Sequence, residues 1–166
     1  MANQVLAATV TQLIRQPWIS NVRFKLSGLS VFAWRYEAVA IAISRGKITC
    51  EVGVPADTNL APGFIAVGRY EPKTRELRFP DEQYGSSSGR EKFNMVHEAT
   101  HASFDCQYGS HEGKDILAID DEAAAWLAQA VYMLESPYFW NGPMMPGDPI
   151  EEATKLAKRE CLIFCV

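Results

Sequence analysis

The sequence predicts an α+β fold in which a small, mostly antiparallel sheet packs on helices. Several segments space apolar residues at helical intervals, a middle region alternates apolar and polar residues as half-buried strands do, and one predicted helix carries two histidines four positions apart. With 166 residues, 48% of them hydrophobic, the chain can bury its own core, and we find neither an internal repeat nor a linker. We therefore expect a single domain over residues 1–166.

Two helices are expected ahead of the sheet. The first covers residues 4–15 and is stopped by Pro17. The second covers residues 29–44, where the apolar residues, Trp34 among them, recur at helical spacing and predict the buried side. Arg35 lies outside that stripe, and we expect it to face solvent.

The sheet is expected between these helices and the histidine pair. Residues 47–54 are rich in β-branched side chains and predict one strand. Residues 64–71 and 75–79 predict two antiparallel strands joined by the turn at 72–74, and a Gly/Ser-rich loop follows at 84–89. An extended peptide could pair with an edge of this sheet, and we expect residues 75–79 to form that edge.

Three helices are expected in the second half of the chain. Ser88 and Glu91 fit a capping box, which predicts a helix over residues 90–106. Apolar spacing predicts a second long helix over residues 116–134 and an amphipathic one over residues 151–164.

The stretch His97-Glu98-Ala99-Thr100-His101 lies within the first of these helices and carries the strongest chemical signal. Because a helix turns about 100° per residue, the two imidazoles share one face and can bind one metal ion. Glu98 lies at the flank of that face, where a general base would hold the attacking water. We therefore expect a Zn²⁺ site at which metal-activated water hydrolyses a substrate.

A catalytic zinc site needs a third protein ligand and an open position for water. Glu122 borders the apolar stripe of the next helix beside Trp126 and Met133, where a buried carboxylate requires a positive partner. Asp120 borders the other edge of that stripe and remains an alternative ligand. Asp121 points about 160° away from the centre of the stripe, so we expect it to be solvated.

The pattern of His97, Glu98 and His101, followed 21 positions later by Glu122, resembles that of the gluzincin metallopeptidases. The resemblance covers residues 90–135 best. It implies a small zincin-like fold, with the sheet packed on the motif helix and on a second ligand-bearing helix. It also implies that the two histidines and Glu122 bind zinc and that Glu98 is the general base and acid of a peptidase. The metzincin class is excluded, because its extended motif needs Gly and His where this chain has Phe104 and Gln107.

The chain departs from the gluzincin pattern at one position. Many gluzincins place an Asp four residues after the ligand Glu to orient a zinc-bound His, and this chain has Trp126 there. Asp105, one turn beyond the second motif histidine, is a candidate for that task. A Tyr or His near the metal usually stabilises the oxyanion, and the candidates are His111, Tyr108 and Tyr132, of which we select His111.

The charge pattern bears on the expected partners. The net charge of −4 and the lack of a Lys/Arg-rich run argue against nucleic acid, and a peptide or protein substrate is expected instead. The apolar run at residues 31–43 is interrupted by Arg35 and Glu37, so it predicts no membrane span. No positive charge precedes Arg15, and we therefore expect a cytoplasmic protein. The sequence carries no signal for an oligomeric state.

Two other interpretations fit the same residues. The first is a zinc-stabilised binding or regulatory protein that retains the His97-to-His101 site without turnover. The second is a metal-free helical protein in which both histidines are core residues satisfied by carboxylates.

Overall fold

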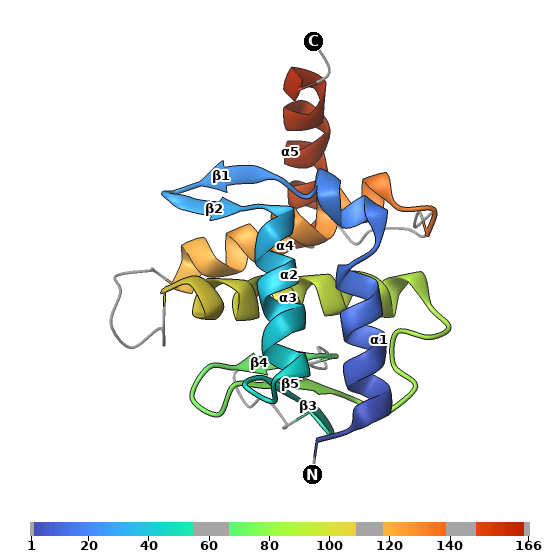
Figure 1. The fold of residues 1–166 in the computed structure, drawn as a ribbon. Coiled ribbons are helices and arrows are strands. Elements are labelled where there is room, and N and C mark those ends of the chain that lie inside the picture. The colour runs from blue at the N-terminus through green and yellow to red at the C-terminus, as the bar shows by residue number, and fades with distance from the viewer. Residues whose placement is uncertain (1, 55–66, 109–117, 139–148, 165–166) are drawn as a thin grey trace, which may run out of the picture.

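The computed structural model describes residues 2–54, 67–108, 118–138 and 149–164 (Figure 1). Helices and small sheets are mixed along this part of the chain, so the α+β class is confirmed. In chain order the elements are α1 (Gln4–Ile14), the 3-10 helix η1 (Pro17–Asn21), β1 (Phe24–Leu26), β2 (Leu29–Val31), α2 (Ala33–Ser44), β3 (Thr49–Val52), β4 (Arg69–Glu71), β5 (Glu76–Phe79), α3 (Gly89–Tyr108), α4 (Ala118–Glu135) and α5 (Pro149–Phe164).

Residues 29–31, predicted as the start of a helix, form strand β2 of a short hairpin with β1. Leu26 pairs with Leu29 across a two-residue turn, in which Ser27 and Gly28 have φ values of 48° and 82°. Two positive φ values in succession are typical of the turn that matches the twist of a hairpin. The Ser-Gly pair is the sequence signal for it, and α2 consequently begins only at Ala33.

The buried face of α2 is not the predicted one. Trp34 is 59% exposed, whereas Arg35 is only 2% exposed and Tyr36 and Val39 are fully buried. The guanidinium carbon of Arg35 lies 5.2 Å from the ring centroid of Trp34 and 5.8 Å from that of Phe104 in α3. Aromatic rings attract a cation that lies over them, which helps to accommodate this charge in the interior. The predicted stripe was therefore wrong by about one residue.

In the described part of the chain, the main sheet has three short strands in the order β3-β5-β4. β4 is antiparallel to β5, as predicted, but β3 is parallel to it, with Cys50 opposite Leu77. Within the residues that the structure describes, antiparallel pairing is found at β4–β5 and in the separate β1–β2 hairpin. The expectation that residues 75–79 form an edge was wrong, because β5 lies between two strands that use both of its sides.

Helix α3 lies at the centre of the fold. It packs against α2 on one side, against α4 on another and against β4, while α5 packs on α4 (Figure 1). Its predicted capping box is only half formed: the backbone N–H of Glu91 donates to the hydroxyl of Ser88 at 3.5 Å, but the Glu91 carboxylate accepts from the N–H of Gly85. These contacts fix the helix that carries the histidine pair.

Candidate metal site

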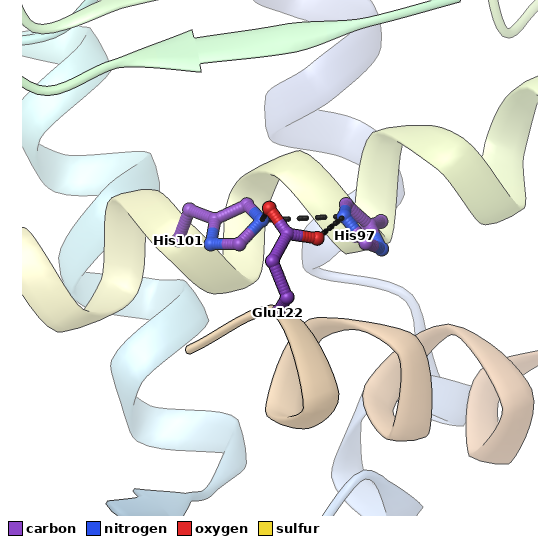
Figure 2. A group of neighbouring side chains, drawn as sticks. All are labelled: His97, His101 and Glu122. Atoms are coloured by element: carbon purple, nitrogen blue, oxygen red, sulfur yellow. Dashed lines mark hydrogen bonds and ion pairs between the residues drawn. The ribbon is translucent and has the colours of Figure 1, made fainter. Parts of the chain in front are cut away.

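Helix α3 presents both motif histidines on the side that faces α4 (Figure 2). The two histidine residues are each 8% exposed, and their Nε2 atoms are 3.2 Å apart. Thr100, on the neighbouring face, is fully buried and its hydroxyl lies 2.8 Å from that of Tyr36 in α2. Helix packing on one side therefore directs the two imidazoles to the other.

The first turn of α4 brings Glu122 to the same point. Its Oε2 lies 3.5 Å from Nε2 of His97, and its Oε1 lies 3.6 Å from Nε2 of His101 (Figure 2). Zinc bound tetrahedrally at about 2.0–2.1 Å places neighbouring donor atoms about 3.3 Å apart, so the observed separations fit one ion. Among the described residues, these three form a group that could hold a metal ion. Asp120, the alternative third ligand, does not belong to that group.

The accessibility of the three side chains also fits a metal site. The histidine side chains are each 10% exposed, whereas the Glu122 side chain is 57% exposed. A site closed on the nitrogen side and open on the carboxylate side leaves room for a further ligand from solvent, as catalytic metal sites do.

Negative charge surrounds His101. Burial by itself lowers the pKa of His101, but contact with Asp121 and the charges of Glu98, Asp121 and Glu122 outweigh burial and raise that pKa to about 9. Hydrogen bonding from His97 lowers the pKa of Glu122, together with the charges of both histidines and against the effect of burial. In the metal-free protein a proton on His101 thus supplies part of the positive charge that a bound cation would supply.

This raised pKa makes the stability of the metal-free protein depend on pH. The pKa of His101 is about 9 in the folded protein, compared with an ordinary value of 6.5. Protonated His101 therefore stabilises the folded state fully below pH 6.5, and this stabilisation is lost as the pH rises through 9. We expect the free energy of unfolding to fall by up to about 3 kcal/mol over that range. Urea unfolding in the presence of a chelator measures it. The variant His101→Gln should show a flatter profile, and a wild-type profile equally flat would contradict the assignment.

Glu98 is held by the outer strand of the sheet. The backbone N–H of Tyr70 in β4 donates to Oε2 of Glu98 at 2.7 Å. At Gly68, an added Cβ would lie 3.1 Å from Cγ of Glu98 and 3.0 Å from the ring of Phe79, so this position favours glycine. The carboxylate of Glu98 therefore lies between α3 and the outer edge of the sheet, with one oxygen engaged by the backbone.

Asp105 does not have the role considered for it. Its Oδ2 accepts a 2.7 Å hydrogen bond from the hydroxyl of Tyr70 and lies 3.4 Å from Nε of Arg75. Asp105 and Glu98 are seven positions apart and thus lie on one face of α3, so both bind the same residue of β4. Asp105 thereby fixes the strand that holds Glu98, and it is Asp121 that contacts His101.

Asp121 is largely buried, contrary to the prediction that it faces solvent. Its side chain is 16% exposed, and its Oδ1 lies 2.9 Å from Nδ1 of His101. The buried stripe of α4 includes Ala124, Leu127 and Ala128, whereas Ile119, an apolar residue seven positions before Trp126, is 74% exposed. Asp121 precedes Ala124 by three positions and hence lies on the buried face.

The position at which many gluzincins have an orienting Asp holds Trp126. The centroid of its ring lies 4.7 Å from that of His97, in an edge-to-face arrangement. Nδ1 of His97 is buried and has no hydrogen-bond partner within the described part of the chain. The two histidines therefore have different surroundings: a carboxylate contacts the second nitrogen of His101, and an indole packs against the ring of His97.

The three candidates for oxyanion stabilisation have different outcomes. The hydroxyl of Tyr132 donates to Oε1 of Gln16 at 2.7 Å, and Tyr132 lies ten residues beyond Glu122, or about 15 Å along the helix axis. This placement does not support a role in the site. His111 and the side chain of Tyr108 lie outside the described residues.

Among the residues that the structure describes, no helix has the length and apolar character that crossing a membrane requires.

Comparison with known proteins does not identify the chain. No known protein family matches the sequence, and no curated protein and no solved structure matches it either.

Proposed function

We propose that this protein is a zinc-dependent metallopeptidase with Glu98 as its general base. One observation carries the proposal: donor atoms of His97, His101 and Glu122, from two neighbouring helices, converge to separations of 3.2 to 3.6 Å. Two imidazole nitrogens with one carboxylate oxygen form a ligand set typical of catalytic zinc sites. The order of elements, with the sheet strands before α3 and the third ligand on α4, supports a zincin-like arrangement.

The proposed reaction assigns separate tasks to these residues. Bound zinc would polarise the scissile carbonyl and lower the pKa of water. Glu98 takes a proton from the attacking water at Oε1, because Oε2 is engaged by the N–H of Tyr70, and passes it to the leaving amine. Within the described residues β4 pairs only with β5, so its outer side is the sheet edge next to Glu98. An extended peptide that reaches the site would lie along this side.

A second candidate is a metal-stabilised binding or regulatory protein without turnover. The contact between Glu98 and the Tyr70 N–H favours it, because a carboxylate that binds a backbone donor also has a structural role. The two candidates share the metal site and differ in hydrolysis, so one set of measurements separates them.

The test combines metal content with hydrolysis. The purified protein is expected to contain about one zinc ion per chain by elemental emission and to cleave members of a quenched fluorescent peptide library. Removal of the metal with a chelator should abolish cleavage, and added zinc should restore it. Bound zinc without cleavage of peptide, amide or ester substrates would favour the second candidate. Absence of zinc binding would refute both.

A further inference from the structure

The first turn of α4 brings two adjacent carboxylates to α3. Glu122 approaches Nε2 of His101 at 3.6 Å, and Asp121 approaches Nδ1 of the same ring at 2.9 Å. Their surroundings differ, since the Glu122 side chain is 57% exposed and that of Asp121 is 16% exposed. The more buried carboxylate thus faces the ring nitrogen that points away from the shared metal position.

This arrangement has a definite consequence for metal binding. A neutral imidazole carries one proton, and the nitrogen that bears it cannot bind a metal. A carboxylate beside one nitrogen keeps the proton there, fixes the orientation of the ring and makes the other nitrogen a stronger donor. With Asp121 beside Nδ1, the lone pair of Nε2 is directed toward Glu122 and His97.

Other acidic residues do not serve this purpose. Asp105 is bound by the hydroxyl of Tyr70 and lies near Arg75. Asp120 precedes Asp121 directly and is partly buried, but within the described chain the carboxylates that pair with the two histidines are those of Asp121 and Glu122. The Nδ1 atom of His97 has no hydrogen-bond partner within the described residues, and the ring of Trp126 packs against this histidine.

We infer that Asp121 is the positioning residue of the metal site, holding His101 so that Nε2 binds the metal. The inference rests on the proposed metal site and deepens it. It assigns the orienting task to the residue just before the carboxylate ligand, so that a single helical turn supplies both a ligand and the group that orients another ligand. It also makes the two histidines unequal, because His101 is oriented by a charge and His97 by packing.

The test measures zinc affinity by competition with a chromophoric chelator. Asp121→Ala should weaken binding roughly 10–100-fold, as loss of such partners typically does. Asp121→Asn keeps a neutral hydrogen-bond acceptor beside His101, so its zinc affinity should fall less than that of Asp121→Ala. The matched control is Asp120→Ala, which removes the same charge from the same turn and should bind zinc as the wild type does.

A second readout reports on the ring itself. In the zinc-loaded wild type, long-range ¹H–¹⁵N spectra of the histidines should show His101 protonated at Nδ1, and Asp121→Asn should alter that signal while leaving His97 unchanged. This readout does not depend on whether Asp121→Ala folds.

The outcomes separate the inference from the proposal on which it rests. A wild type that binds no zinc would refute the metal site. Zinc affinity preserved in Asp121→Ala, or reduced equally in Asp120→Ala, would overturn the positioning role alone. Protonation of His101 at Nε2 in the zinc-loaded wild type would overturn it as well.

Discussion

Replacement of Glu98 by glutamine is expected to reduce peptide hydrolysis roughly 10²–10⁴-fold, the usual contribution of a general base. The amide has nearly the shape of the carboxylate, and its oxygen can still accept the hydrogen bond from Tyr70. It cannot take a proton from water at neutral pH. Because Glu98 is not one of the three ligand residues, zinc content should remain at the wild-type level. Elemental emission and the initial rate of peptide cleavage measure the two quantities.

The chain offers a matched control for this substitution. Glu91 lies on the same face of α3, two turns earlier, and its Oε2 accepts a backbone N–H from Gly85 at 2.9 Å, much as Glu98 accepts one from Tyr70. Glu91→Gln therefore makes the same chemical change in a similar structural contact, away from the ligands. It should leave hydrolysis unchanged. Equal losses in the two variants would assign the effect to structure, and full activity in Glu98→Gln would exclude Glu98 as the base.

The group of His97, His101 and Glu122 could be predicted because each of the two helices has a strong sequence signal. A pair of histidines four positions apart must share a helix face, whatever surrounds it. The position of Glu122 near the histidines requires only that the next long helix packs beside α3. Consecutive helices are usually neighbours, because the connections between them are short. The metal itself and the reaction remain predictions.

The surroundings of the site could not be predicted to the same depth. The buried stripe of α4 includes several alanines, such as Ala124 and Ala128, which weigh little in a search for apolar periodicity. The large side chains of Ile119 and Trp126 displaced the predicted stripe by about one residue. As a result, the prediction placed Asp121 on the solvent side. A similar shift misplaced Arg35, because its contact with the ring of Phe104 comes from another helix.

The order of the strands in the sheet could not be predicted from the sequence either. Alternation identifies a strand and its two faces, but it does not say which strands lie on either side. Residues 75–79 were correctly predicted as a strand, and their partner on one side was too. On the other side, β5 pairs with β3 in parallel. The long connection between these two strands carries no sequence signal for that pairing.

Replacement of both His97 and His101 by alanine is expected to abolish zinc binding, since it removes two of the three donor groups and leaves only Glu122. At a zinc concentration 100 times the dissociation constant, binding stabilises the wild type by about 2.7 kcal/mol. For a domain of this size that corresponds to an increase in melting temperature of roughly 5–11 °C. The double variant should show no increase. Differential scanning calorimetry with and without zinc measures the shift.

The third histidine provides the control for this experiment. His111→Ala removes the remaining imidazole of the chain and should keep both the zinc and the thermal shift, because the site needs only the pair on α3 and Glu122. The single variants His97→Gln and His101→Gln retain polar side chains and guard against misfolding of the double variant, which far-UV circular dichroism detects. If zinc still stabilised the folded double variant by the wild-type amount, the ion would bind elsewhere. The convergence of α3 and α4 would then be a packing arrangement in which buried histidines are satisfied by carboxylates.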